Sequence, residues 1–494
     1  MPIPDRPTVL MITSELHPIV KVGGLADAVS QLSQYLQAQG CDVRVVMPMY
    51  RDCACTIASS FPVGAVTLGK HRYNARVNVT SVGNIPVYLL DIPELYDRDG
   101  IYGPRVDAAF DDNLVRYGIF CAAVPHICAA LQWQPDIIHG HDWEASLVPC
   151  LHRLHHSAET HRPAHIITIH NIGYQGEFAT EDIEGLGLTS SQAKSVGLIH
   201  NNRLNLLAGG IYSSDRFSTV SRTYSKEIQH HHGFGLERLV RQRTDKLAGI
   251  TNGLDYDEWD PLHDPYISCC FDSDRIEGKL GCKKQLQQHF NLPVDENIPV
   301  IGLVSRLVEQ KGIVELADPT HGALQQLVLS SSVQYVILGS GEQWCEKELV
   351  RLGSLHCNVG VHIGFDTTLS HMIAAGSDFF LMPSRYEPCG LSQLYAMRYG
   401  SLPIATRTGG IADTVTDKST GFLFESATPQ NILRSVQRAV ATYNNHRSEY
   451  ERMQQNAMQQ RHNWEKAAGL YIEMYRTTLL ATEHHSAPRR RFNR

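Results

Sequence analysis

Short apolar runs rich in β-branched residues recur along this chain with helical segments between them, and this alternation restricts the folds it can adopt. The first such run is residues 8–12, followed by apolar residues at helical spacing over residues 25–36 and a second run at residues 43–47. A strand, a helix and a strand in this order predict a parallel pair joined by a helical crossover. Further strands are expected at residues 136–139, 166–170 and 217–220.

A second series of the same kind starts near residue 300. Its expected strands are residues 300–304, 333–338, 361–363, 378–382 and 402–405. A chain of 494 residues exceeds the roughly 250–300 that one hydrophobic core holds, so two α/β domains are expected. We expect the domains at residues 1–258 and 299–463, a linker at 259–298, a helix at 464–483 that returns to the first domain, and a basic tail at 484–494.

Composition excludes several classes of function. Lys and Arg total 44 against 51 for Asp and Glu, a net charge of -7, which argues against a nucleic-acid partner. No run approaches 18 apolar residues, so neither a membrane span nor a membrane partner is expected. The N-terminus lacks the pattern of a signal peptide, and the 12 scattered cysteines lack the spacing of a zinc site. Together these features predict a reduced, cytoplasmic protein.

Ligands of open parallel sheets bind at the carboxyl ends of strands, so the informative polar residues are those in the turns after each predicted strand. In the first turn Lys21 precedes Gly23 and Gly24, which open a helix. Bare backbone and a helix N-terminus suit a phosphate or a sugar. The spacing matches neither a dinucleotide fingerprint nor a P-loop, and a plain tight turn is an equally good interpretation.

Two further turns of the first series carry histidines. The segment His139-Gly140-His141-Asp142-Trp143 combines an aromatic face with hydrogen-bonding groups, as sugar sites do. A metal site is the competing hypothesis, although no further convincing ligands are visible. His170 ends the next strand, where a histidine is often simply hydrogen-bonded in place.

The second series offers cations, an acid and glycines. Arg306 closely follows a buried strand and Lys311 comes five residues later, so the two could clamp a diphosphate, unless both are solvated surface cations. Glu387 follows another strand, where a catalytic or sugar-binding acid and a solvated loop acid are equally plausible. The turn Thr408-Gly409-Gly410 presents bare amides, as a phosphate cradle would.

The chain resembles bacterial glycogen synthases and plant starch synthases. The resemblance rests on seven motifs in the family's order, which are KVGGLAD, HDW, TIHNIGYQG, ITNGLDYDEWDP, SRLVEQKG, PSRYEPCGL and RTGGIADTV. It implies a GT-B fold, in which two Rossmann-like domains face each other across a cleft. It also implies transfer of glucose from ADP-glucose to the non-reducing 4-hydroxyl of an α-1,4-glucan, with retention of configuration. Enzymes of this kind need no bound metal and no cofactor.

The same resemblance assigns roles to residues. It places Asp142 and His170 near the transferred glucose and assigns both of them, with Glu387, to catalysis. The residues implied to contact ADP-glucose are Lys21, Gly23, Gly24, Asn252, Arg306, Lys311, Thr408, Gly409 and Gly410, of which Lys21 is also assigned to catalysis. The residues implied for a sugar or acceptor pocket are His141, Trp143 and Tyr174.

Some features fall outside this assignment. Glu144 stands where many family members have His or Gln. The histidines at positions 230–232 and the arginines at 489–491 are interpreted as solvated surface rather than as a metal site or an anion contact. Two other functions stay open: a GT-B transferase that uses another nucleotide sugar on a lipid or cell-wall acceptor, and a glucan-binding protein without activity.

Overall fold

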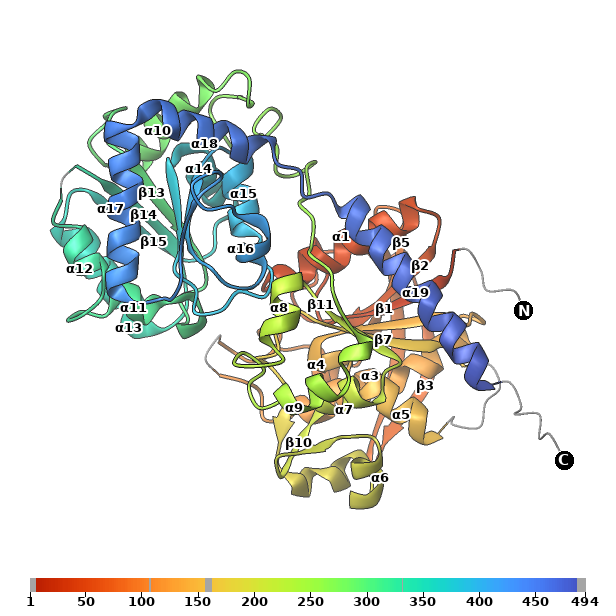
Figure 1. Cartoon of the computed structure of the whole chain (residues 1–494). Helices are drawn as coiled ribbons and strands as arrows, with labels where there is room; N and C mark the ends of the chain where they lie inside the picture. The colour runs from red at the N-terminus through yellow and green to blue at the C-terminus, as the bar shows by residue number, and fades with distance from the viewer. Residues whose placement is uncertain (1–5, 106–107, 156–161, 331, 487–494) are drawn as a thin grey trace, which may run out of the picture. The chain divides into compact units, whose positions relative to one another are not determined.

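The computed structural model describes residues 6–105, 108–155, 162–330 and 332–486, and these divide between two units (Figure 1). The first unit comprises Met1–Gly253 and Trp464–Arg494, and the second comprises Leu254–Asn463. Each unit is built around a parallel sheet of its own, as the alternation of apolar runs predicts. The arginines at 489–491 lie outside the described residues.

The sheet of the first unit has nine strands in the order β12-β11-β7-β6-β1-β2-β5-β4-β3. Seven of them are mutually parallel: β1 (Thr8–Ile12), β2 (Asp42–Pro48), β5 (Ile85–Asp91), β6 (Ile137–His141), β7 (Ala164–Ile169), β11 (Arg216–Thr219) and β12 (Leu247–Gly249). The five strands expected from the first series are confirmed to within two residues at either end. Their buried apolar faces explain why continuous apolar runs identified them.

The edge of this sheet differs from the sequence-based expectation. The strands β3 (Ser59–Leu68) and β4 (His71–Val82) extend it as antiparallel hairpins beside β5. A smaller sheet contains β8 (Glu177–Phe178), β9 (Ile199–His200) and β10 (Arg203–Asn205). The α-helices of the unit are α1 (Gly24–Ala38), α2 (Pro93–Tyr96), α3 (Asn113–Ala130), α4 (Asp142–Ala145), α5 (Leu147–His155), α6 (Ser190–Ser195), α7 (Leu206–Ser213), α8 (Arg222–Glu227), α9 (Glu237–Gln242) and α19 (Trp464–Ser486).

Within the described ranges, α3 alone is long and apolar enough to cross a membrane by length and composition. Most of it, 61%, is buried inside the protein, and it carries the buried Arg116. The Arg116 guanidinium donates to the carbonyl oxygens of Leu95 and Ile101. A core helix of a globular domain passes the same test, so α3 is weak support for a membrane span.

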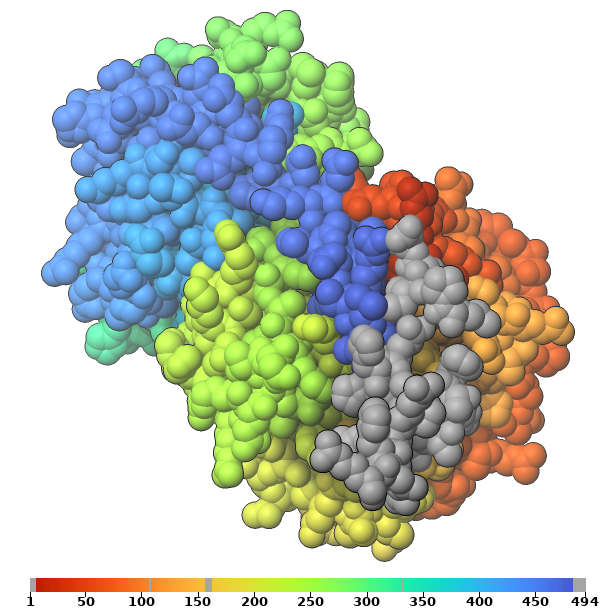
Figure 2. All heavy atoms as spheres, turned by 45° about the vertical axis from the view of Figure 1, so that its right-hand side comes forward, coloured from red at the N-terminus to blue at the C-terminus, as the bar shows by residue number. Residues whose placement is uncertain are grey.

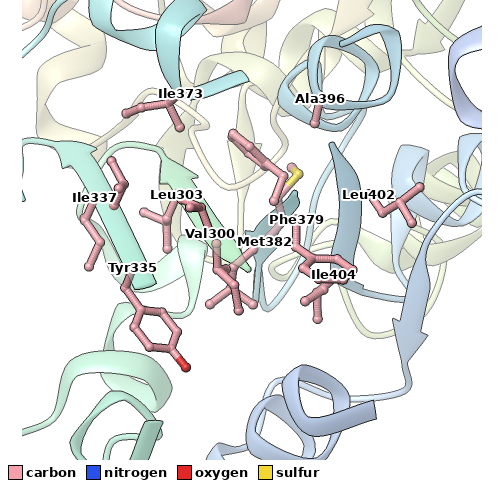
Figure 3. Packing of buried hydrophobic residues seen from close by; sticks show 14 of the residues in the cluster. Val300, Leu303, Tyr335, Ile337, Ile373, Phe379, Met382, Ala396, Leu402 and Ile404 are labelled. Carbon is pink, nitrogen blue, oxygen red and sulfur yellow. The ribbon is translucent and has the colours of Figure 1, made fainter. Parts of the chain in front are cut away.

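The second unit has six parallel strands in the order β15-β14-β13-β16-β17-β18. These are β13 (Val300–Val304), β14 (Gln334–Gly339), β15 (Val359–Ile363), β16 (Phe379–Met382), β17 (Leu402–Thr406) and β18 (Phe422–Phe424), and only β18 is missing from the sequence-based expectation. Apolar side chains of β13, β14, β16 and β17 pack together with Ile373 and Ala396 from the neighbouring helices (Figure 3). The α-helices are α10 (Gly278–His289), α11 (Ile313–Ala317), α12 (Leu324–Leu327), α13 (Gln343–Leu355), α14 (Thr367–Gly376), α15 (Ser392–Arg398), α16 (Gly409–Thr414), α17 (Pro429–Asn445) and α18 (Arg447–Gln459). Helices α17 and α18 form part of its surface, in blue in Figure 2.

Residues 259–298, expected as a linker, are instead an integral part of the second unit. Trp259, Phe271 and Leu286 are buried in its apolar core. The Lys283 ammonium lies 2.8 Å from the Asp378 carboxylate, just before β16. The segment looks weakly periodic because loops precede α10, but those loops carry large apolar anchors. The boundary falls at Gly253 and Leu254 rather than after residue 258.

The last helix, α19, belongs to the first unit and packs against α1 (Figure 1). Its Tyr471 and Tyr475 are buried, and the Tyr475 hydroxyl lies 2.8 Å from Nδ1 of His139 in β6. The chain therefore passes from the first unit to the second after Gly253 and returns to the first unit at Trp464.

Candidate active site

Four of the proposed site residues of the first unit lie at one edge of its sheet. Lys21, Asp142, His170 and Asn252 follow the carboxyl ends of β1, β6, β7 and β12. These strands are parallel, so their carboxyl ends point to the same edge. Polar groups separated by more than 200 positions in the sequence are thereby placed along one edge of the sheet.

The glycine turn before α1 is held by a buried acid. The Glu15 carboxylate accepts hydrogen bonds from the Val22 and Gly23 amides at 2.5 and 3.0 Å, and from the Tyr102 hydroxyl at 2.5 Å. The Lys21 ammonium lies 2.7 Å from the carboxylate of Asp27, in the first turn of α1. The turn is therefore pre-formed, with its cation on the outside and its amides engaged by an internal acid.

Asp142 links the ends of β6 and β7. Its Oδ1 accepts hydrogen bonds from the amides of His170 at 2.6 Å and Asn171 at 3.3 Å. Asp142 has φ +57, a left-handed conformation that Asp tolerates better than most side chains. Burial raises the pKa of Asp142 to about 7, although the two amides lower it. The residue is thus fixed in place, and its burial favours the protonated form.

The three histidines of this edge form a close, neutral group with tilted rings. Nδ1 of His141 lies 3.0 Å from Nε2 of His170, and the rings of His139 and His141 are 4.3 Å apart. Burial lowers the pKa of His139 and of His170 to about 3, and lowers that of His141 well below its usual range. A neutral His170 is suited to donate or accept a hydrogen bond with a sugar hydroxyl.

A metal site at this edge does not fit the contacts. Both ring nitrogens of His139 contact hydroxyls, those of Tyr475 at 2.8 Å and Thr168 at 2.6 Å. Among the residues that the structure describes, no group of three His, Cys, Asp or Glu side chains is placed to hold a metal ion. The histidines at 230–232 lie in the loop after α8, and Nδ1 of His230 contacts the carbonyl of Lys226.

The proposed sugar pocket residues have different environments. Trp143 is buried, with its ring 5.0 Å from that of Tyr117, and a Cβ at Gly176 would collide with the indole. Tyr174 is 50% exposed. Trp143 therefore supports the turn from within, whereas Tyr174 offers a ring to solvent. His141 is buried and reaches a ligand only through His170.

In the second unit, the proposed residues again follow neighbouring strands at one edge. Arg306 comes after β13, Glu387 after β16 and Thr408 after β17, and these three strands are adjacent and parallel. Arg306 is partly exposed. The predicted cation, acid and glycine turn thus follow three neighbouring strands of the sheet.

Two of the proposed residues of the second unit, Lys311 and Glu387, are in direct contact. The Lys311 ammonium lies 2.6 Å from Oε2 of Glu387, and the Ser384 hydroxyl donates to the same oxygen at 2.9 Å. Glu387 is 5% exposed. An ammonium has three donors, so Lys311 can hold this carboxylate and a phosphate oxygen together. The cation proposed for the diphosphate and the acid proposed for the sugar are therefore in direct contact.

The glycine turn of the second unit packs against the acid's own backbone. The Gly410 amide donates to the carbonyl of Glu387 at 3.1 Å. A Cβ at Gly409, which has φ +44, would lie 1.8 Å from that carbonyl, and one at Gly410 would lie 2.0 Å from the carbonyl of Cys389. Glycine is needed at both positions because the two loops touch. The turn is therefore a support for Glu387 as well as a candidate phosphate cradle.

The sequence-based analysis missed two residues of this site. Glu15 engages the first glycine turn and Ser384 holds Glu387. Both follow the carboxyl end of a strand within three positions, Glu15 after β1 and Ser384 after β16. A search for every polar residue in those turns, rather than for cations and glycines, would have found them.

Comparison with known proteins identifies the family. Residues 8–242 match the starch synthase catalytic domain, and residues 284–460 match glycosyl transferases group 1. The chain is 40% identical to the glycogen synthase of Treponema denticola, over 94% of this chain and 97% of that protein. The chain belongs to the glycogen and starch synthase family. Glycogen synthase of Thioalkalivibrio sulfidiphilus is a further relative, 37% identical over 95% of this chain and 99% of its own.

The solved structures agree with this family. The catalytic domain of starch synthase IV from Arabidopsis thaliana, bound to ADP and acarbose, superposes on this chain with a TM-score of 0.87 at 29% identity. The superposition covers 96% of this chain and 100% of the starch synthase chain. The predicted GT-B fold and glucosyltransferase activity in glycogen synthesis are confirmed. As a family member, the enzyme takes a nucleotide-sugar donor and a glucan acceptor.

Proposed function

We propose that this enzyme transfers glucose from ADP-glucose to the non-reducing 4-hydroxyl of an α-1,4-glucan, with retention of configuration and without a bound metal or cofactor. The proposal rests on the contact between Lys311 and Glu387. This contact puts a cation suited to the diphosphate beside an acid suited to the sugar, and these are the two groups that separate when a nucleotide sugar reacts. The ADP and acarbose bound to the starch synthase relative support this choice of donor and acceptor. We further propose that the enzyme acts in the cytoplasm.

In the proposed mechanism, breaking the anomeric C–O bond leaves negative charge on the diphosphate and positive charge on the sugar. Lys311 and Arg306 stabilise the first charge, together with the turn at 408–410, in place of the metal that other nucleotide-sugar enzymes use. Glu387 stabilises the oxocarbenium-like sugar. When the diphosphate takes up part of the Lys311 charge, the Glu387 carboxylate becomes freer to act on the sugar.

The first unit is proposed to position the transferred glucose and its acceptor. Lys21 adds positive charge beside the glycine turn, and His170 offers a neutral ring nitrogen to the sugar hydroxyls. Asp142 fixes His170 through the backbone, and the exposed ring of Tyr174 is a stacking surface for a glucan.

The decisive experiment measures transfer of labelled glucose to glycogen by the purified chain. ADP-glucose and UDP-glucose are compared at equal concentrations, with Glu387→Ala beside the wild type. We expect turnover with ADP-glucose, weaker turnover with UDP-glucose, and a loss of at least about 10²-fold in Glu387→Ala. Preference for UDP-glucose would contradict the proposed donor, and no transfer from either would contradict the proposed activity.

A further inference from the structure

A cationic cavity lies in the first unit, away from the proposed catalytic edge. It has a volume of about 390 Å³, within the range of small-molecule sites. Its walls come from α5, α7, the start of β7, the residues before β11 and the turn after α9 (Figure 1). His165 is the second residue of β7, whereas His170 follows its other end, which places them about 16 Å apart along the strand.

The charge of the lining is strongly positive. Arg153, Arg162, Arg243 and Lys246 face a single lining acid, Asp215. Arg162 holds both oxygens of Asp215, at 2.6 and 2.9 Å, and the His165 amide donates to the same carboxylate.

The acid is therefore already engaged, while Arg153, Arg243 and Lys246 form no ion pair with any residue in the described part of the chain. Asp245, which is exposed, offsets part of their charge.

The arginines are held close together by an aromatic ring. The guanidinium groups of Arg153 and Arg243 lie 5.4 and 5.6 Å from the ring of Tyr212. Burial lowers the pKa of Arg243, and the charge of Arg153 lowers it further; burial and Arg243 lower the pKa of Lys246 in the same way. Like charges kept together in this manner are stabilised by a bound anion.

Two buried nitrogens of the lining also lack partners. Nε of Arg243 and Nδ1 of His165 form no hydrogen bond within the described structure. Most buried polar atoms in proteins are hydrogen-bonded, so two orphans in one cavity wall need an explanation. His165 is only 3% exposed, burial lowers its pKa to about 3, and its Nε2 contacts Nδ1 of His152, another residue of the lining. Nε of Arg243 is a donor, and a bound anion would supply the acceptor that it lacks.

We propose that this cavity binds a phosphoryl group, either as inorganic phosphate or as the phosphate ester of a small metabolite, at a site separate from the catalytic edge. Guanidinium and ammonium donors match the geometry and charge of phosphate oxygens. A simpler explanation is that the cations stabilise helix ends, since Arg243 donates to the carbonyl of Ser214 after α7 and Arg153 lies in the last turn of α5. It accounts for neither Lys246 nor the orphan nitrogens.

The test is calorimetric titration of the full chain with inorganic phosphate and with glycerol phosphate, at neutral pH and at ionic strength matched with chloride. The double variant Arg153→Gln/Lys246→Gln removes two cations that make no ion pair within the described residues, and we expect it to bind phosphate at least about tenfold more weakly. Arg203→Gln, which changes an exposed cation on β10 of the same unit, is the matched control and keeps wild-type affinity. Tighter binding of glycerol phosphate than of phosphate identifies an ester as the ligand.

A third variant separates this site from the proposed donor site. Lys311→Ala removes phosphate binding at the catalytic residues but leaves binding in the cavity unchanged. The proposal is overturned if the wild type shows no heat of binding at millimolar phosphate, or if binding is lost in Lys311→Ala and kept in the double variant. If the double variant fails to fold by circular dichroism, Arg153→Lys/Lys246→Arg, which retains both charges, must retain binding.

Discussion

Lys311 and Glu387 show how one contact links binding to chemistry at the scale of single residues. Their 2.6 Å separation places opposite charges together in a mostly buried setting, where the attraction is stronger than in water. The Ser384 hydroxyl adds a second donor to the carboxylate. Removal of either charged group therefore changes the environment of the other, so their effects on turnover are not expected to add.

We expect Lys311→Ala to lower turnover by about 10²-fold or more, the usual effect of losing one charge-stabilising donor. Steady-state transfer from ADP-glucose to glycogen measures this loss. The matched control is Lys347→Ala, which removes an exposed lysine from α13 of the same unit and should keep wild-type turnover. A near-wild-type rate for Lys311→Ala would mean that other groups hold the diphosphate.

Glu144 is a buried acid whose surroundings favour the protonated, neutral form. Burial raises its pKa well above the usual range, the Asp142 charge raises it further, and its Oε2 has no hydrogen-bond partner in the described structure. A protonated Glu has the shape and polarity of Gln. This explains how Glu144 fits a position where many members of the family have His or Gln.

Glu144→Gln should therefore change the free energy of unfolding at neutral pH by less than about 1 kcal/mol, because a neutral amide replaces a neutral carboxyl group. Glu144→Ala should cost about 2 kcal/mol or more, since it leaves a cavity beside buried residues. Urea denaturation of the three proteins gives both values. A loss of several kcal/mol in Glu144→Gln would show that the native side chain is ionised.

At the scale of elements, most of the parallel strands were predicted, whereas the parallel strands β5, β12 and β18 and the antiparallel edge were not. Strands such as β1 and β13 are buried on both faces, so they stand out as continuous apolar runs. β3 and β4 alternate between more and less exposed residues, which is a weaker signal than a continuous apolar run. The tight turns that join β3, β4 and β5 contain Gly69 and Gly83, and these glycines were the available signal.

The proposed site was predictable to a similar degree. Cations, acids and glycines that directly follow buried strands were found, because strand ends are visible in the sequence. The position of Glu15 after β1 is visible in the sequence, but its role is not, because that role depends on contacts with Val22 and Tyr102. The burial of Trp143 likewise depends on a contact with Tyr117. Contacts between distant segments leave no local pattern.

The start of α16 gives a test of the contact between two loops. In Gly409→Ala the new Cβ meets the Glu387 carbonyl at 1.8 Å, in addition to the cost of about 1 kcal/mol for a non-glycine residue at φ +44. We expect Glu387 to be displaced and turnover to fall by more than about tenfold.

Gly83→Ala is the matched control for the Gly409 variant, because Gly83 has φ +57 but nothing within 4 Å of its Cβ. It carries the same backbone cost without the collision, so it should lose stability and keep its turnover. Equal turnover in the two variants would mean that the turn does not position Glu387.

The buried histidines of β6 give the stability of the first unit a defined pH dependence. The folded-state pKa of His139, about 3, lies below the value near 6.5 of an unfolded chain. Below about pH 6.5 the unfolded state therefore binds a proton that the folded state does not, and stability is lost as the pH falls toward 3. The raised pKa values of Asp142 and Glu144 act in the opposite direction.

Comparison with His139→Gln isolates the histidine from these acids. Between about pH 6 and 4 the wild type should lose about 1.4 kcal/mol per pH unit more than this variant, as measured by urea denaturation. Tyr475→Phe removes the hydrogen bond to His139 but keeps the imidazole, so it should lower stability and retain the wild-type slope. Parallel slopes for the wild type and His139→Gln would show that His139 is protonated in the folded protein.

At the scale of the whole molecule, the first unit is completed by the last helix of the chain. Trp464, Ala468, Tyr471 and Tyr475 of α19 are all buried, and the Tyr475 hydroxyl contacts a strand of the central sheet. In the sequence, the second unit (Leu254 to Asn463) lies between the two parts of the first unit. It contains a hydrophobic core of its own. The stability of the first unit should therefore depend on α19, and that of the second should not.

A chain that ends at residue 463 tests this dependence. Each large side chain of α19 contributes about 1.5–3 kcal/mol by burial, so their loss is comparable with the whole stability of a typical domain. We expect the first unit to unfold at a much lower temperature, or not to fold, while the second retains its calorimetric transition. A chain that ends at residue 486 keeps α19 and should match the full-length protein. If both transitions shift together in the shorter chain, the units fold as one cooperative body and the second also depends on α19.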